Sequence, residues 1–301
     1  CKRYTGTFYT LTVRFHSNMD DNSVDETAAG VLSSEFNLDF ASCVGAFIYL
    51  ALSRLDISHA VNKLAKFTRR PGRKHFMALV HVLRYLRDHS YLGITYYSDL
   101  DRSAIARLLT NSDSVSALGK ELFYTFCDSS WNDDVDTGRS TGSYLIIYMG
   151  GVVDHSSNMP DPVALSSAEA EYNEACLACM ATSHMVMFLN ELEGNKQPRL
   201  KIPLILDSKS AIAMGNSFRD TKHTRHILRR YHYVREAVDA GRFQLYWIKT
   251  DDELADIATK QTPGPRHNLL TSILLVPVVD LVKHVKAAFA KIVQYKRGDS
   301  I

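Results

Sequence analysis

The chain has 301 residues, a length typical of about two domains, and a formal net charge of +2, which selects no partner by itself. Its composition of 46% hydrophobic and 10% aromatic residues is sufficient to bury a core and excludes a disordered chain. The five cysteines are odd in number and follow no secretory signal, which favours a reduced intracellular setting, cytoplasmic or nuclear, over a secreted disulfide framework.

Two further classes are disfavoured by pattern. No uninterrupted run reaches the about 18 apolar residues that a membrane span requires, so no membrane partner is expected. The pair Cys176-x-x-Cys179 has no second pair at zinc-binding spacing and falls within a helical pattern. It is therefore interpreted as core packing in preference to a metal or redox site.

The first part of the chain is predicted to be a linker followed by helices. Residues 1–40 show no sustained hydrophobic period and read as a linker or ragged N-terminus. A helical segment is predicted over residues 41–110, with apolar residues at helix spacing on both sides of a break at Pro71-Gly72. Polar residues 98–120 are expected to form a linker, with a short turn at residues 105–109.

The helical segment carries a marked excess of positive charge. Nine basic residues lie between Arg54 and Arg87, against the single acid Asp56. A basic face of this kind can follow a phosphate backbone. An ordinary solvated helix surface has the same composition, and the sequence leaves both interpretations open.

After Gly119 the hydrophobic period changes to that of strands and helices in alternation. The predicted order is β-β-β-α-β-α-α-β-α, which indicates an α/β fold with helices packed on a mixed sheet. The predicted strands are residues 122–128, 143–149, about 152–153, 202–207 and 243–248, and the helices are 167–192, 210–214, 225–240 and one from about residue 254.

The stretch ALSSAEAEY contains two glutamates with different expected roles. Ser166 and Glu169 have the spacing of a capping box, in which the serine accepts from one free backbone N–H and the glutamate from another. Glu171 lies about 200° further around the helix and faces the predicted sheet. A carboxylate in that position needs a partner, because burying an unpaired charge is costly.

Three more carboxylates stand at positions that can converge with Glu171. Asp128 and Asp207 each end an apolar strand, and Asp256 lies at the head of the last helix. Each alone is also explained as a turn, cap or first-turn residue. Four converging carboxylates would repel one another, and divalent cations relieve that repulsion. A pair of Mg²⁺ ions about 3.5–4 Å apart can activate water and stabilise a leaving oxygen in phosphodiester cleavage.

Taken in order, the motifs of the chain resemble a known family. The resemblance is to Ty1/copia-type retrotransposon polyproteins, specifically the end of the reverse transcriptase and the ribonuclease H domain that follows it. It covers about residues 41–262. The motifs are Val44–Leu50, Arg54–Ile57, Leu83–Leu86, Tyr124–Trp131, Arg139–Gly142, Val163–Tyr172, Leu206–Ser208, Arg225–His232 and Leu254–Lys260.

This resemblance implies a fold, a domain plan and an activity. Residues 41–110 would be a thumb- or connection-like segment, residues 121–262 a ribonuclease H-like domain with a mixed five-stranded sheet flanked by helices, and residues 263–301 a tail. The enzyme would cleave the RNA strand of RNA–DNA hybrids, leaving a 3′-hydroxyl and a 5′-phosphate, as part of a larger polyprotein. The catalytic and metal-binding residues would be Asp128, Glu171, Asp207 and Asp256, holding two Mg²⁺ ions, with Mn²⁺ as a substitute.

Recognition of the hybrid would rest on helix shape, 2′-hydroxyl contacts and phosphate contacts. The expected nucleic-acid-binding residues are Lys63, Lys66, Arg69, Arg70, Arg73, Lys74, Arg225 and Arg230. His226 and His232 also match family positions, but structural packing is the favoured interpretation for both.

The sequence departs from the family in two ways that bear on activity. The paired aspartates of the polymerase are absent, so this chain is not expected to synthesise DNA. The stretch between Gly151 and Val163 lacks the tryptophan and lysines usual there, and residues 121–260 hold 14 basic against 20 acidic residues, a net charge of −6. A catalytically decayed remnant, acting at most as a nucleic-acid-binding module, is therefore the alternative function. A recombinase-like nuclease acting on DNA is a weaker third interpretation.

Overall fold

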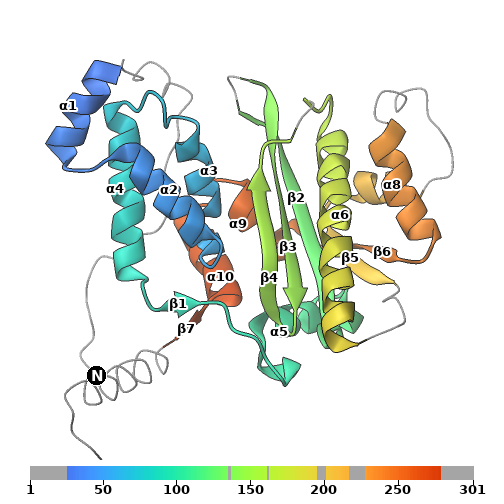
Figure 1. Cartoon of the computed structure of the whole chain (residues 1–301). Coiled ribbons are helices and arrows are strands. Elements are labelled where there is room, and N and C mark those ends of the chain that lie inside the picture. Colours follow the sequence, from blue (N-terminus) through green and yellow to red (C-terminus); the bar gives the residue numbers. More distant parts are fainter. Residues whose placement is uncertain (1–25, 135–136, 161–162, 195–200, 217–227, 279–301) are drawn as a thin grey trace, which may run out of the picture.

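The computed structural model describes residues 26–134, 137–160, 163–194, 201–216 and 228–278 (Figure 1). For residues 26–29 and 228–231 it describes the backbone alone. Most of the predicted N-terminal linker and the end of the predicted tail fall outside these ranges. Within the expected linker, residues 26–36 form a helix.

The helix in the expected linker and the helices of the predicted helical segment up to Asp88 gather around an apolar core of their own. Asp39 begins the second of them by accepting a hydrogen bond from the Ser42 backbone N–H at 2.8 Å. The chain breaks at Pro71-Gly72 as predicted, and the next helix starts at Arg73. Buried apolar side chains from all of these helices, Phe76 and Leu79 among them, form the core. The helices are α1 (Glu26–Phe36), α2 (Phe40–Ala51), α3 (Ser58–Ala65) and α4 (Arg73–Asp88).

The stretch expected to be a polar linker is instead built into the core. Residues 104–111 form helix α5 (Ala104–Asn111), and residues 116–120 form a 3-10 turn. Ile105 and Leu109 are fully buried against the sheet. A helix of two turns shows too few apolar repeats in the sequence to stand out from a loop.

The prediction of an α/β fold with a mixed five-stranded sheet is confirmed. The strand order is β4-β3-β2-β5-β6. The first three strands are antiparallel neighbours, whereas β5 is parallel to both β2 and β6. The predicted turn at Gly150 joins β3 to β4 with a positive φ of 70°. The strands are β2 (Phe123–Asp134), β3 (Arg139–Tyr148), β4 (Gly151–Asn158), β5 (Ile202–Leu206) and β6 (Phe243–Trp247).

Helices cover both faces of the sheet, and the side chains of β2 alternate between them. Phe123 and Cys127 point toward the layer of α6, α7 and α8, whereas Tyr124 and Phe126 point toward α5, α9 and α10. Cys176 and Cys179 pack in the apolar core between the sheet and the layer of α6, α7 and α8, as the sequence predicted. These helices are α6 (Ser167–Glu193), α7 (Lys209–Gly215), α8 (Leu228–Asp239), α9 (Asp256–Thr259) and α10 (Gly264–Leu274).

The helical segment packs directly beside strand β4 (Figure 1). His155 Nε2 of β4 lies 2.9 Å from the carbonyl oxygen of Ala51, and the Asn62 amide donates to the Ser157 hydroxyl at 3.3 Å. The predicted tail adds a further connection, because β7 (Val276–Pro277), which follows α10, pairs with β1 (Leu92–Gly93), which follows α4. These contacts connect the helices to the sheet at several points.

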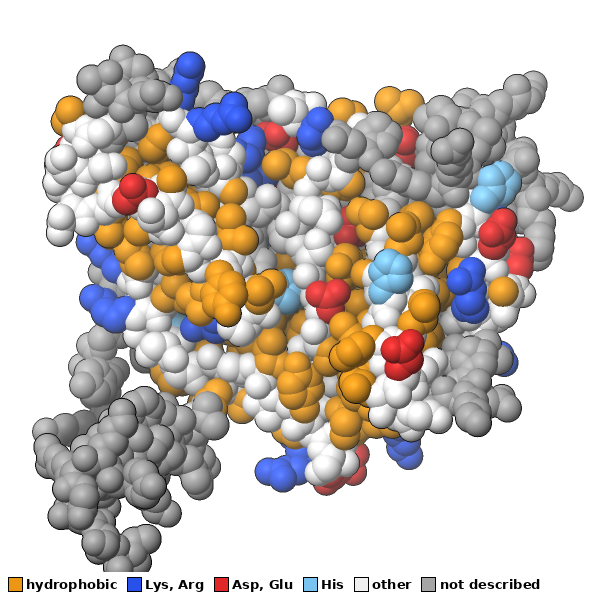
Figure 2. Space-filling model, viewed as in Figure 1, with side chains coloured by type: hydrophobic (Ala, Val, Ile, Leu, Met, Phe, Trp, Pro, Cys, Tyr) orange, Lys and Arg blue, Asp and Glu red, His pale blue; other side chains and the backbone are white. Residues whose placement is uncertain are grey.

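Two helices present apolar side chains to solvent. Ile48 and Tyr49 of α2 are exposed, as is Leu52 directly after this helix, and Met187 and Phe188 of α6 are exposed. Figure 2 shows hydrophobic side chains over both regions of this face. Helix α6 has the length and hydropathy of a membrane span, and a second span would exist if the bent pair Gly30–Phe36 and Phe40–Ala51 were continuous. Since one side of α6 packs on the sheet, we interpret it as a core helix.

Candidate active site

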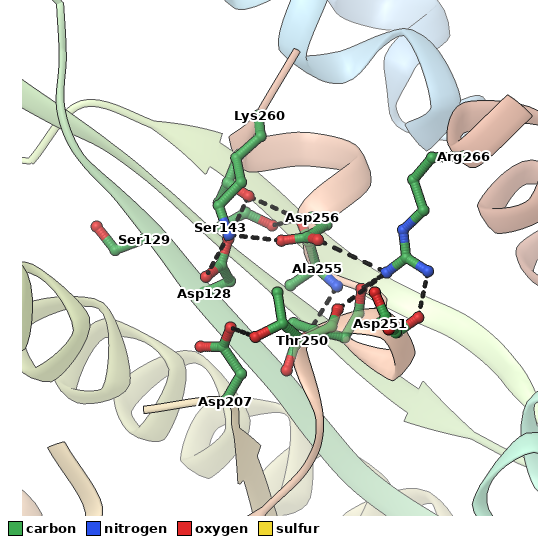
Figure 3. A network of polar contacts seen from close by, with 12 residues as sticks. Asp128, Ser129, Ser143, Asp207, Thr250, Asp251, Ala255, Asp256, Lys260 and Arg266 are labelled. Atoms are coloured by element: carbon green, nitrogen blue, oxygen red, sulfur yellow. Dashed lines mark hydrogen bonds and ion pairs between the residues drawn. The ribbon is translucent and has the colours of Figure 1, made fainter. Parts of the chain in front are cut away.

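Asp128 lies at the centre of the site, in the middle of the central strand β2. Its side chain is fully buried. It shares its face of the sheet with Tyr124 and Phe126, as the period of two predicted, and so it faces α9. The Thr259 hydroxyl donates to one Asp128 oxygen, and the Lys260 ammonium lies 3.0 Å from the same oxygen (Figure 3).

Glu171 approaches Asp128 from the first turns of α6. It is 7% exposed, and its Oε2 has no hydrogen-bond partner among the described residues. Burial, with the nearby carboxylates of Asp128 and Asp207, raises the pKa of Glu171 to about 10. The backbone of Ser129 and the Lys260 ammonium act in the opposite direction.

The neighbouring glutamate has the structural role that the sequence predicted. The Ser166 hydroxyl accepts from the Glu169 backbone N–H at 3.2 Å and so caps α6. Glu169 Oε2 accepts from the backbone N–H of Leu165 at 2.9 Å, one residue before the cap residue expected. The two glutamates of the ALSSAEAEY stretch therefore have different roles.

Asp207 follows the last residue of β5, and because β5 is parallel to β2 its carboxylate reaches the same end of the sheet. The Thr250 hydroxyl donates to Asp207 Oδ2 at 2.9 Å, and the Trp247 indole N–H donates to the Asp207 carbonyl at 3.0 Å. The next residue, Ser208, caps α7 by accepting from the Ala211 backbone N–H. These bonds fix the carboxylate at the edge of the cluster (Figure 3).

The structure thus brings Asp128, Glu171 and Asp207 together. One ligand oxygen from each lies within 4.8 Å of the other two. The donor set fits a hard divalent cation, since all three donors are carboxylates and the buried Glu171 Oε2 has no other partner among the described residues. An arrangement of this kind can hold a cation against the scissile phosphate of a nucleic acid.

Asp256, the fourth predicted carboxylate, begins α9 and joins the cluster on its other side. It lies outside the group of three and is linked to Asp128 by Lys260, whose Nζ is 2.7 Å from Asp256 Oδ1. The Arg266 guanidinium is 3.6 Å from Asp256 Oδ2. Burial and the Asp128 carboxylate raise the pKa of Asp256 to about 6, against the effect of Lys260.

Three polar residues of this region were not among the predicted site residues. Thr259 and Lys260 bind Asp128 directly. Glu253 is fully buried, and its Oε1 accepts from the Ala255 backbone N–H at 3.0 Å. Burial, and then Asp128, raise the pKa of Glu253 well above its ordinary value. The signal for Lys260 was its place four residues after Asp256, on the same helical face.

The predicted phosphate-binding residues divide into two groups. Lys63 of α3 forms an ion pair with Asp133, and Lys66, directly after α3, forms one with Asp134 at 2.5 Å; both acids lie at the end of β2. Of the rest, Arg73 pairs with Glu35 at the surface. Arg69, Arg70 and Lys74 are exposed. Arg225 and His226 lie outside the described residues, as does the side chain of Arg230, and His232 is exposed on α8.

The mixed sheet, with carboxylates gathered from the middle of β2, the end of β5 and the start of α6, defines a ribonuclease H-like domain. No family model matches the sequence. The chain is nevertheless 29% identical over 237 residues to the retrovirus-related Pol polyprotein of transposon TNT 1-94 of Nicotiana tabacum. It is 30% identical over 224 residues to that of transposon RE1 of Arabidopsis thaliana. The chain belongs to this family of copia-type retrotransposon polyproteins.

The matches cover most of this chain but only a small part of each polyprotein. They span 78% and 74% of this chain, but 16% and 14% of the two polyproteins. A further relative is the secreted RxLR effector protein 161 of Plasmopara viticola, 36% identical over 45% of this chain and 83% of that protein. Among solved structures, RNase H1 of Halobacterium salinarum is 16% identical with a TM-score of 0.35, covering 45% of this chain and 92% of that one.

Proposed function

We propose that the chain is a metal-dependent ribonuclease H that cleaves the RNA strand of RNA–DNA hybrids, as one part of a retrotransposon polyprotein. The observation that carries this proposal is the meeting of Asp128, Glu171 and Asp207 within 4.8 Å, from three separate elements of an α/β sheet domain. Family membership supports both the reaction and the hybrid as substrate.

The four carboxylates have distinct tasks in this proposal. Asp128, Glu171 and Asp207 would hold one Mg²⁺, and Asp128 with Asp256 a second, with Mn²⁺ as a substitute. The ions supply an activated water and a stabilised leaving oxygen for phosphodiester hydrolysis. Thr259 and Thr250 orient the Asp128 and Asp207 carboxylates through their hydroxyl hydrogens, so the ligands are positioned before the ions arrive.

Hydrolysis leaves a 3′-hydroxyl on one RNA fragment and a 5′-phosphate on the other. The specificity for RNA would come from 2′-hydroxyl contacts, because the 2′-hydroxyl distinguishes RNA from DNA at a given site. We propose an intracellular setting, cytoplasmic or nuclear. Cys43, Cys127, Cys176 and Cys179 support it, because they are thiols that are not joined in disulfides.

A binding-only remnant is the second candidate function. It is supported by the −6 charge of residues 121–260 and by the ion pairs that occupy Lys63 and Lys66. Both features weaken the attraction of this chain for phosphates.

The test is incubation of the whole chain with a hybrid, a DNA duplex and an RNA duplex of one sequence, each with Mg²⁺ or EDTA. Ribonuclease H activity predicts cleavage of the hybrid RNA strand alone, in Mg²⁺ alone. Binding without cleavage would favour the remnant, and cleavage of the DNA duplex would favour a DNA nuclease.

A further inference from the structure

Lys260 holds a position that ordinary surface lysines do not. It follows the last residue of α9, and its side chain turns back toward the sheet. Its Nζ lies 2.7 Å from Asp256 Oδ1, 3.0 Å from Asp128 Oδ2 and 3.2 Å from Asp128 Oδ1 (Figure 3). The ammonium thus lies between two buried carboxylates that come from different elements.

The contacts divide the cluster into two cation positions that meet at Asp128. On one side, Asp128 faces Glu171 and Asp207, where Glu171 Oε2 has no hydrogen-bond partner among the described residues. On the other side, Asp128 faces Asp256, and the Lys260 ammonium occupies the space between them. A lysine ammonium is a compact point charge, so it can take a place that a metal ion would otherwise fill.

We propose that Lys260 is a built-in cation for the second position of the cluster. This inference rests on the proposed function only in that the cluster takes divalent cations. One divalent ion binds readily at Asp128, Glu171 and Asp207. A second can bind between Asp128 and Asp256 only when the Lys260 side chain swings away.

The surroundings of Lys260 allow that movement. Its side chain is one third exposed, whereas that of Asp128 is fully buried, so the ammonium has a path to solvent. Asp256 keeps a second cation nearby, because the Arg266 guanidinium lies 3.6 Å from its other oxygen. Arg266 also donates to the carbonyl oxygens of Thr250 and Glu253, which holds it in place. Departure of Lys260 therefore opens the second position without leaving Asp256 unsupported.

The first test counts bound ions, with Mn²⁺ as the probe and the free ion measured by electron paramagnetic resonance. The unaltered whole chain should bind one Mn²⁺ tightly and a second weakly. In Lys260→Met the second ion should bind about tenfold more tightly or better. Lys260→Arg keeps the charge and should resemble the unaltered chain. Lys120→Met, which removes the same charge from an exposed position before β2, should do so too.

The second test is the melting temperature without metal. Lys260→Met should lower it by at least about 5 °C, because two buried carboxylates are left without their shared partner, and Mn²⁺ should restore more than it does in the unaltered chain. Equal Mn²⁺ counts and affinities in Lys260→Met and the unaltered chain would overturn the inference. If the counts differ but no hybrid is cut, the role of Lys260 stands and the proposed nuclease function fails.

Discussion

Glu169 and Glu171 show how two residues of one kind, two positions apart, are separated by their surroundings. Glu169 accepts from a backbone N–H at the start of α6, which any carboxylate or amide oxygen can do. Glu171 is turned into the cluster, where burial and two other carboxylates raise its pKa to about 10. Its position is costly for a metal-free protein, and a bound cation would offset that cost.

Paired substitutions measure this difference between the two glutamates. We expect Mg²⁺ to raise the melting temperature of the unaltered chain and of Glu169→Gln by the same amount, since a glutamine oxygen can still accept from Leu165. Glu169→Gln should cost at most about 1 kcal/mol of stability. In Glu171→Gln the Mg²⁺ effect should fall by more than half, because the ion has one carboxylate ligand fewer. Equal Mg²⁺ shifts in the two variants, measured by thermal melting, would remove Glu171 from the metal site.

A site residue could be recognised from the sequence where a local pattern marks it. It could not where its role depends on contact with a residue far away in the chain. Asp128 and Asp207 stand out because each follows a run of apolar residues typical of a strand, although β2 continues past Asp128 to Asp134. Their strands are parallel neighbours, so the two carboxylates come close together. Lys260 is recognisable in sequence as the i,i+4 partner of Asp256, but it reaches Asp128 across 132 residues. No local pattern reveals such an approach. The burial of Glu253 depends in the same way on the packing around it.

At the scale of elements, a buried network of hydrogen bonds around Asp56 connects the helices to the sheet domain. The Asp56 carboxylate accepts from Arg54 at 3.0 and 2.7 Å and from the Tyr85 hydroxyl at 2.7 Å. His267 Nε2 of α10 lies 3.0 Å from the Asp56 carbonyl oxygen, and Arg54 also donates to the His89 carbonyl. This network therefore links the turn before α3, helix α4 and helix α10.

Substitutions that disrupt this network should lower the free energy of unfolding more than a similar substitution at an exposed position. Asp56→Ala leaves the Arg54 guanidinium buried without its carboxylate, and we expect a loss of about 3–5 kcal/mol. Tyr85→Phe removes one hydrogen bond to a charged group and should cost about 1.5–3 kcal/mol. Asp101→Ala, at an exposed position, should stay within about 0.5 kcal/mol. Urea unfolding of the three variants measures these losses of stability. A loss below about 1 kcal/mol for Asp56→Ala would contradict the proposed role of the network.

At the scale of the whole molecule, residues that precede the first strand of the sheet contribute to the core of the sheet domain, whereas helices α1 to α4 pack around a separate core. Leu55, Ile105 and Leu109 from before the first strand of the sheet pack in one cluster with Phe126 and Ile257. The sequence separated the two parts because residues 98–120 are polar on average. Long amphipathic helices such as α4 and the apolar strands were predictable from their period, whereas the short α5 gains its stability from tertiary contacts.

Ion pairs within the chain also decide which basic residues can contact a hybrid. Lys63, near the end of α3, and Lys66, directly after it, pair with acids at the end of β2, so they should contribute to stability more than to binding. We expect the triple change of Arg69, Arg70 and Lys74 to Gln to flatten the salt dependence of hybrid binding by about 0.9 for each phosphate that is no longer neutralised. Lys63→Gln should leave the slope unchanged. Binding titrations at several salt concentrations in EDTA measure both, and an unchanged slope in the triple variant would make these residues an ordinary solvated face.

If the chain is a nuclease, the carboxylates of Asp128, Glu171 and Asp207 must be required for cleavage of the RNA strand of a hybrid. The most direct test of the nuclease proposal is the cleavage rate of a hybrid labelled on the RNA strand, measured in Mg²⁺ for the whole chain and for Asp128→Asn. We expect RNA fragments with 5′-phosphates from the unaltered chain, and a rate at least about a hundredfold lower from the variant. A folded, unaltered chain that binds the hybrid in Mg²⁺ and leaves its RNA strand intact would contradict the proposal.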